Sequence, residues 1–173
     1  SANFGNMVSM ALAAPFLPFL PLAAKQILLN NFLSNLPSIA ISSDNVDKER
    51  VSRPQRWSIK SIQRFMIVFG LISSVFDLLT FAMLLLVFRA DEAIFQTTWF
   101  TTSLLTQLAV VLILRSRKPS FQSKPSGLLL WSTVAVLVAT LAIPYLGAAS
   151  SVFGFVPLSW REIGVVIAIV AGY

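Results

Sequence analysis

The sequence contains no cysteine and no histidine, and only 12% of its 173 residues are charged. Without cysteine the chain cannot form disulfides or thiolate metal sites, and without histidine it lacks the commonest metal ligand and proton shuttle near neutral pH. Any ion site must therefore use oxygen atoms. Soluble domains carry about 25% charged residues, so this chain has too few to cover its surface in water.

Hydrophobic residues make up 56% of the chain, and the mean hydropathy is +0.79. The apolar runs are longer than a core helix of a soluble protein needs, and they have no polar face. The sequence therefore predicts an all-α, polytopic bundle of transmembrane helices.

Three stretches have the length and hydropathy of membrane spans, namely 65–88, 97–114 and 127–147. The second stretch carries Trp99 and Phe100 near its start, which is typical of an aromatic belt at the membrane interface.

The region before residue 43 contains a proline at every third position, which cannot lie inside one continuous helix. These residues are Pro15, Pro18 and Pro21. Their spacing predicts a turn between a first helix in residues 1–16 and a second in 25–42. A further proline, Pro37, is expected to break the second helix.

Lys and Arg concentrate in two segments, with six in residues 43–64 and four in 115–124. Short cytoplasmic loops are enriched in these residues, so loops 43–64 and 115–126 are expected in the cytoplasm. Topology then accounts for the net charge of +6. Phospholipid headgroups, and not nucleic acid, are the expected partners of the basic loops.

The two ends of the sequence predict a fragment of a longer protein, which we call the parent. A polar run opens the chain without the pattern of a signal peptide. The final apolar segment, 161–173, has only about half of the roughly 20 residues that a membrane span needs.

Polar residues gather in the first two predicted helices. Asn3 and Asn6 are three residues apart and share a helix face, and Gly5 between them allows another backbone to approach. In the second helix a cluster precedes Pro37. Its members are Asn30, Asn31, Ser34 and Asn35.

Proline would free the carbonyls of about Leu33 and Ser34 from helix bonding. Freed carbonyls and amide oxygens together suit a cation, and broken helices are a common way to build ion sites in transporters. Alternatively, each amide only bonds between helices, at about 1 kcal/mol or less. The joint pattern of two clusters on adjacent helices favours a transport pathway.

Asp77 is the sole acidic residue in the middle of a predicted span. An intramembrane carboxylate indicates a functional site, although it can also be protonated or bonded to nearby helix ends. Gln107, Ser73 and Ser74 are interpreted as packing residues, and Gly70 with Ser74 forms a small-residue pair at which helices can approach. No phosphate-binding glycine loop or nucleophile with a base is present, so the fragment alone should hydrolyse nothing.

Several segments resemble P-type cation-transporting ATPases. Residues 1–6 (SANFGN) resemble the middle of the fifth transmembrane helix of that family, and 30–37 (NNFLSNLP) resemble the sixth. Shorter stretches resemble the magnesium-importing branch of that family in particular. These are 44–47 (DNVD), 54–57 (PQRW), 64–66 (RFM) and 72–77 (ISSVFD).

The resemblance implies helices five to ten of such a pump, truncated at both ends. Residues 1–42 would then supply part of the ion pathway, residues 43–64 a cytoplasmic loop, and residues 65–173 supporting helices. The domains that bind ATP with magnesium and become phosphorylated would lie elsewhere in the parent.

The resemblance also implies ligand positions in both polar clusters. The implied ligands are Asn3 and Asn6, then Asn30 or Asn31, Ser34 and Asn35. Calcium pumps have Glu at the position of Asn6 and Asp near Ser34 or Asn35, whereas this chain has neutral groups there. Magnesium keeps several waters when bound, so neutral oxygens could hold the partly hydrated ion through hydrogen bonds.

The leading hypothesis is thus the membrane part of an ATP-driven cation transporter, with magnesium as the transported ion, in the inner (plasma) membrane of a bacterium. Its partners would be membrane lipid, the cation and the remaining domains of the parent. Two alternatives stay open, a structural or regulatory helix bundle and a small oligomeric transporter or channel.

Overall fold

The fold was analysed in a computed structural model that describes residues 2–41, 56, 58–87, 89, 91–114 and 126–173. The predicted cytoplasmic loops 43–64 and 115–126 lie mostly outside these residues. Of Ala2 and Asn3 the backbone alone is described.

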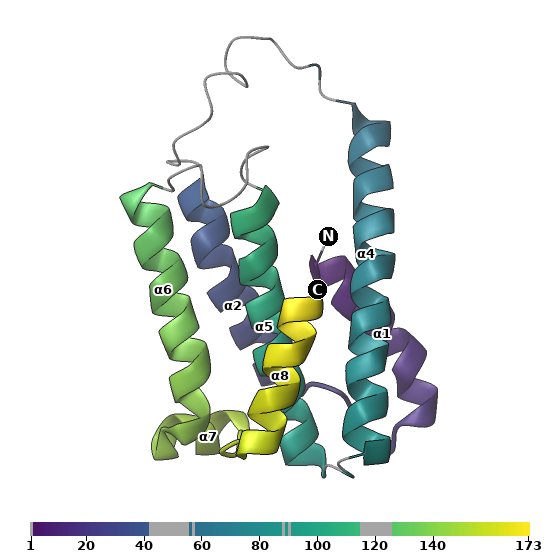
Figure 1. The fold of residues 1–173 in the computed structure, drawn as a ribbon, viewed down its shortest axis with the longest axis vertical. Helices are drawn as coiled ribbons and strands as arrows, with labels where there is room; N and C mark the ends of the chain where they lie inside the picture. Colours follow the sequence, from purple (N-terminus) through teal and green to yellow (C-terminus); the bar gives the residue numbers. More distant parts are fainter. Residues whose placement is uncertain (1, 42–55, 57, 88, 90, 115–125) are drawn as a thin grey trace.

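The described residues form the predicted all-α bundle (Figure 1). Its α-helices are α1 (Ala2–Ala13), α2 (Ala24–Ala40), α4 (Ile59–Ala82), α5 (Glu92–Leu114), α6 (Gly127–Ala142), α7 (Gly147–Phe153) and α8 (Trp160–Gly172). Three short helical turns accompany them, namely η1 (Ala14–Phe16), the π-helical η3 (Met83–Val87) and η4 (Ile143–Tyr145). The long helices α2, α4, α5 and α6 run along the long axis, and α7 lies across one end.

Two helices begin earlier than the apolar pattern predicts. The helix α4 starts at Ile59, where the hydroxyl of Ser58 accepts a hydrogen bond from the Ser61 amide at 3.4 Å. The helix α5 starts at Glu92, and Asp91 accepts from the Ile94 amide at 2.9 Å. Both first turns contain a charged residue, Lys60 in α4 and Glu92 in α5, so hydropathy missed them while side-chain capping of the free amides stabilises them.

The three closely spaced prolines separate α1 from α2, as expected. The turn η1 contains Pro15, the backbone becomes extended at Leu17, and α2 begins only at Ala24. The chain therefore reverses direction between the two helices that carry the asparagines (Figure 1).

The predicted break at Pro37 is wrong, because α2 continues through this residue to Ala40. Proline removes only one backbone donor, and its fixed φ suits a helix. The hydroxyl of Ser38 donates to the Ser34 carbonyl at 3.0 Å, so that carbonyl is not freed.

The segment between the predicted stretches 127–147 and 161–173 contains a helix that the sequence analysis did not predict. The short α7 is built from small residues and ends at Gly154, whose φ of 71° is left-handed. The preceding α6 ends at Ala142, and the chain continues in the tighter turn η4, which contains Pro144.

The helix α5 lies at the centre of the bundle. Its Trp99 and Phe100 are fully buried, so their prediction as an interfacial belt is wrong. Because α5 begins at Glu92, both residues lie two turns inside the helix. The ring of Phe81 on α4 meets that of Trp99 edge-on, with centroids 4.7 Å apart.

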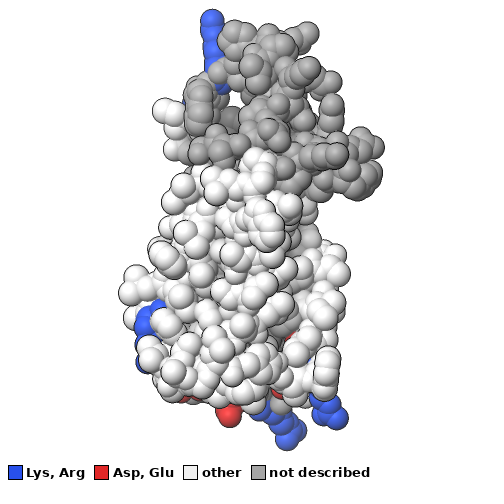
Figure 2. All heavy atoms as spheres, turned by 90° about the vertical axis from the view of Figure 1, so that its left-hand side faces the viewer, with Lys and Arg blue, Asp and Glu red and all other residues white. Residues whose placement is uncertain are grey.

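The outer surfaces of the bundle are apolar. Two helical stretches of the described chain are long and apolar enough to cross a membrane, Ile59–Val87 and Gly127–Tyr145, with mean hydropathies of 2.2 and 2.0 over an 18-residue window of each. Large side chains such as Val75 on α4 and Trp131 on α6 point outward. On the face in Figure 2 the middle of the molecule is uncharged, and the charged side chains lie toward its two ends.

Candidate cation site

Close packing of α1 on α4 orients the face of α1 that carries the polar residues. A Cβ added to Gly5 would lie 2.9 Å from the Ser73 Cβ and 3.0 Å from the Gly70 carbonyl oxygen. The Ser74 hydroxyl lies 3.1 Å from the Gly5 carbonyl, within hydrogen-bond distance. Gly5 therefore permits the backbone approach that its sequence context predicted, and Gly70 with Ser74 forms the other side of the contact.

Four polar side chains from three helices meet in the interior. We call them the amide cluster: Asn6 of α1, Asn30 of α2, and Ser103 and Gln107 of α5. The Asn6 Nδ2 donates to the Ser103 Oγ at 2.7 Å. The Gln107 Nε2 donates to the Asn30 Oδ1 at 3.1 Å and to the Ser103 Oγ at 3.0 Å.

The amide cluster is largely shielded from the surroundings. Asn30, Ser103 and Gln107 are buried, and Asn6 is half-buried. The Ser103 oxygen also has the Asn30 Nδ2 at 3.5 Å, so three amide nitrogens surround one hydroxyl. A hydroxyl oxygen has only two lone pairs, so the long Asn30 contact is the weakest of the three.

Two amide oxygens of the amide cluster accept no hydrogen bond from the part of the chain that the structure describes. Among the described residues, no hydrogen-bond donor reaches the Asn6 Oδ1 or the Gln107 Oε1. Amide oxygens of this kind are ligands for hard cations and acceptors for the waters that a cation carries. The arrangement can therefore offer neutral oxygen, but no charge, to an ion.

The remaining predicted ligands lie in different settings. Ser34 is buried one turn beyond Asn30, and its hydroxyl donates to the Asn31 carbonyl at 3.2 Å. Asn31 is half-buried and Asn35 is exposed, so they form a neighbouring face of α2. The side chain of Asn3 lies outside the described residues.

Ser103 and Gln107 are the members that sequence reasoning missed, since Gln107 was interpreted as a packing residue and Ser103 was not singled out. They lie four residues apart, so they share one face of α5. That spacing of two polar residues within a predicted span was the available signal. Their position opposite α1 and α2 became visible only in the fold.

Asp77 forms a second polar group beside the amide cluster. Its Oδ2 lies 2.7 Å from the Ser9 Oγ of α1, and its Oδ1 accepts from the Trp99 Nε1 of α5 at 3.0 Å. The residue is only 7% exposed. Asp77 thus binds side chains of two neighbouring helices, not helix ends.

Glutamines close the end of the bundle next to α7. The Gln26 Nε2 donates to the Phe153 carbonyl at 2.8 Å, and the Gln96 Nε2 donates to the Leu20 carbonyl at 2.8 Å. The two glutamines are also in contact at 3.3 Å. They connect the proline-containing turn, α5 and the end of α7.

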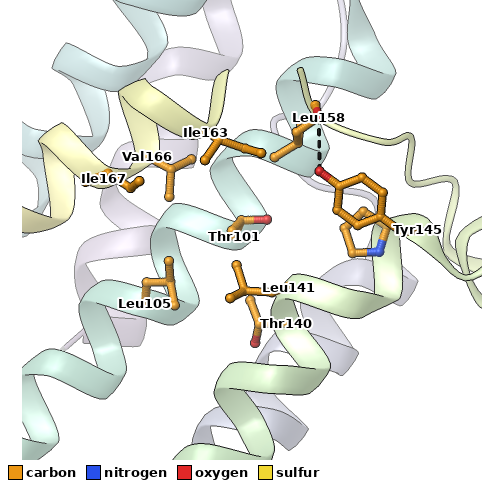
Figure 3. Close-up of a pocket in the computed structure, with 10 residues that line it drawn as sticks. Thr101, Leu105, Thr140, Leu141, Tyr145, Leu158, Ile163, Val166 and Ile167 are labelled. Atoms are coloured by element: carbon orange, nitrogen blue, oxygen red, sulfur yellow. Dashed lines mark hydrogen bonds between the residues drawn. The ribbon is translucent and has the colours of Figure 1, made fainter. Parts of the chain in front are cut away.

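An apolar pocket of about 370 Å³ lies between α5, α6 and α8 (Figure 3). Tyr145 borders it and donates to the Leu158 carbonyl at 3.0 Å. The two threonine hydroxyls at the pocket, those of Thr101 and Thr140, are bonded to carbonyls of their own helices. The pocket has no charged lining residue and is unsuited to a cation.

Comparison with known proteins identifies the family of this bundle. Residues 19–173 match the family described as "Cation transporting ATPase, C-terminus". The chain belongs to this family. Three members of the amide cluster, Asn30, Ser103 and Gln107, fall within the matched region, whereas α1 precedes it.

Proteins similar to this chain include bacterial magnesium-transporting ATPases. Their similarity to the chain extends over α1. The chain is 41% identical over its whole length to "Magnesium-transporting ATPase, P-type 1" of Escherichia coli (strain K12). It is 40% identical, again over its whole length, to the protein of the same name in Salmonella typhimurium (strain LT2). In both comparisons the chain spans only 20% of the relative.

Proposed function

We propose that this chain is the membrane-embedded part of an ATP-driven magnesium transporter and supplies part of its cation site. The observation that carries the proposal is the amide cluster, which joins α1, α2 and α5 around neutral oxygens. The names of the relatives support magnesium as the transported ion.

The chemistry of the amide cluster favours a hydrated ion. Magnesium gives up its waters reluctantly, and water bound to it is a strong hydrogen-bond donor. The Asn6 Oδ1 and the Gln107 Oε1 would accept from such waters while the amide nitrogens keep the cluster together. In the described part of the chain no three acidic, histidine or cysteine side chains form a metal site, so positive charge must be balanced from elsewhere.

Asn31 and Asn35 indicate that the site is incomplete in this chain. They lie four residues apart on α2, beside apolar side chains such as Phe32, which is 61% exposed. An amide that faces hydrocarbon without a partner costs free energy. We infer that another helix of the parent covers this face of α2 and completes the cation site.

ATP hydrolysis belongs to other parts of the parent in this proposal. The parent would bind ATP with magnesium and form a phosphorylated aspartate in a cytoplasmic domain. Loops 43–64 and 115–126 would face that side of a bacterial inner membrane, and the apolar surfaces of α4 and α6 would contact lipid. The chain by itself is expected to be inactive.

A second candidate function is a purely structural or regulatory bundle. The short Asn6–Ser103 hydrogen bond of 2.7 Å favours it, because the amide cluster then serves only to join helices. Interhelical hydrogen bonds of this kind stabilise membrane proteins by about 1 kcal/mol.

Cation-stimulated ATPase activity of the full-length parent separates the two candidates. The variants are Asn6→Ala and Asn30→Ala, measured against magnesium, calcium, potassium and sodium. As a matched control, Thr102→Val removes a buried hydroxyl that bonds only to the Thr98 carbonyl of its own helix. Asn35→Ala and Asn35→Asp test the exposed face of α2 in the same assay.

Under the transport proposal, Asn30→Ala raises the half-saturating magnesium concentration by about tenfold, which corresponds to about 1.4 kcal/mol. The control keeps the parent's response. If Asn6→Ala and Asn30→Ala both fold and respond to every cation as the parent does, the amide cluster is only structural.

A further inference from the structure

Asp77 bonds to one residue of α1 and one of α5. Each of these two residues lies one helical turn from a member of the amide cluster. Ser9 follows Asn6 by three residues on α1, and Trp99 precedes Ser103 by four residues on α5. The helices run in opposite directions (Figure 1). The carboxyl group therefore bridges α1 and α5 directly beside the Asn6–Ser103 contact.

Few other contacts link α1 and α5. The helix α1 packs extensively on α4 and only slightly on α5. Among the described residues, the side-chain hydrogen bonds that link α1 to α5 are the Asn6–Ser103 bond of 2.7 Å and the bridge through Asp77. The Asp77 bridge therefore helps to set the distance between Asn6 and Ser103.

The hydrogen atoms available in the bridge determine whether each carboxyl oxygen of Asp77 accepts or donates a hydrogen bond. Trp99 can only donate, so the Asp77 Oδ1 must accept. Ser9 has one hydroxyl hydrogen and two neighbours, the Gly5 carbonyl at 2.8 Å and the Asp77 Oδ2 at 2.7 Å. Oδ2 can therefore accept from Ser9, or it can carry a proton and donate to Ser9 while Ser9 donates to Gly5.

An asparagine at this position can make the same connections. Its Oδ1 would accept from Trp99, and its Nδ2 would donate to the Ser9 oxygen, which then donates to Gly5. Leucine has the same branched arrangement of heavy atoms, with methyl groups in place of the two oxygens, and can make neither bond. The pair of substitutions therefore separates hydrogen bonding from packing.

We propose that Asp77 is a positioning residue of the cation site: by holding Ser9 of α1 and Trp99 of α5, it keeps Asn6 and Ser103 at the separation that binds the ion. This inference rests on the proposed function. It assigns Asp77 a role through Asn6 and not as a ligand.

The test measures magnesium-stimulated ATPase activity of the full-length parent with Asp77→Leu and Asp77→Asn. We expect Asp77→Leu to raise the half-saturating magnesium concentration about tenfold and to change the maximal rate little, since two hydrogen bonds to a buried carboxyl group are lost. Asp77→Asn should return the half-saturating concentration to within about threefold of the parent.

A double-mutant cycle with Asn6→Ala tests whether Asp77 acts through Asn6. Contacting or coupled residues give non-additive effects, whereas independent residues add. We expect Asp77→Leu to raise the half-saturating concentration much less in the Asn6→Ala background than in the parent. Additive effects, or a change confined to the maximal rate, would overturn the positioning role.

Two milder variants keep the test decisive if Asp77→Leu does not fold. Ser9→Ala and Trp99→Phe each remove one bond to Asp77, and each should raise the half-saturating concentration by about threefold. If neither variant raises the half-saturating magnesium concentration, the inference is wrong. If Asn6→Ala itself leaves the magnesium response unchanged, the cation site fails, and the role of Asp77 fails with it.

Discussion

The neighbouring helices α5 and α6 differ in which side chains they expose and which they bury. The described residues of α6 expose large apolar side chains such as Trp131 and Val138, which are 72% and 58% exposed. The helix α5 buries a series of hydroxyl and amide side chains instead. The comparison shows that, among the described residues, the helix with the most buried polar side chains occupies the centre, as expected where the surroundings are lipid and polar groups must find partners inside.

By hydropathy α6 is the clearer membrane helix of the two, yet it is α5 that carries residues of the candidate cation site. Among the described residues, the stretch that includes α6 and the stretch formed by α4 with η3 are long and apolar enough to cross a membrane, whereas α5 is not among them, although 97–114 was one of the predicted spans. The site residues Ser103 and Gln107 lie on α5.

Within α5 itself, polar residues divide into two groups. The hydroxyls of Thr98, Thr101 and Thr102 bond to carbonyls one turn earlier in α5. Ser103 and Gln107 bond to other helices. The first group satisfies itself locally, and only the second depends on the tertiary arrangement.

The largest expected effect is the contrast in lipid contact between α6 and α5. In single-tryptophan variants of the parent, brominated lipids should quench Trp131 strongly and Trp99 hardly at all, because Trp99 is 0% exposed. Fluorescence in reconstituted vesicles measures this difference. Equal quenching of the two residues would contradict the central position of α5.

The next effect concerns the packing that orients α1. Gly5→Ala should lower the free energy of unfolding by about 1–3 kcal/mol, because its Cβ meets the Gly70 carbonyl, a backbone atom that cannot turn away. Gly164→Ala in α8 is the matched control, since nothing lies within 4 Å of its Cβ. It should be neutral or stabilise the helix by about 0.5–1 kcal/mol.

Thermal unfolding of the detergent-solubilised parent checks both glycine variants. Equal melting temperatures for Gly5→Ala and Gly164→Ala would show that α1 and α4 do not pack this closely.

A smaller effect is expected when the site face of α5 is made as apolar as α6. Gln107→Leu removes the donor to the Asn30 Oδ1 and should cost about 1–2 kcal/mol of unfolding free energy. Thr106→Val is its neighbour and control, because the Thr106 hydroxyl bonds only to the Ser103 carbonyl of the same helix. A greater loss in Thr106→Val than in Gln107→Leu would contradict the division of polar residues within α5.

The smallest effect is expected on α6. Thr133 is 8% exposed, and its hydroxyl is the buried side-chain oxygen without a partner among the described residues. Thr133→Val keeps the shape and removes this group, so it should stabilise the protein by up to about 1 kcal/mol. A loss of stability in the same unfolding assay would indicate that Thr133 has a partner in the membrane.

Several features of the fold and site were predictable from local patterns. The prolines before α2 predicted the reversal of the chain, and Gly5 predicted the close approach at α1. Asn6 and Asn30 were both among the candidate ligands, and they meet at Ser103. These predictions depended on properties of single residues and their immediate neighbours.

Other features could not be read from the order of residues. Trp99 at the edge of an apolar run has the appearance of an interfacial residue, yet α5 extends beyond that run and buries it. Pro37 has the chemistry of a helix breaker, yet α2 passes through it. In both cases the remaining contacts of the helix outweigh the local signal.

By itself, the sequence determined that the chain forms apolar helices, where its polar residues interrupt them, and that an ion site must use oxygen atoms. Only the tertiary structure decided which polar residues meet: Gln107 with Asn30, Ser103 with Asn6, and Asp77 with Ser9 and Trp99. Hydrophobicity adds up along the chain and can be read from it. A hydrogen bond between helices requires two side chains within about 3 Å, and that distance is set by how the helices pack.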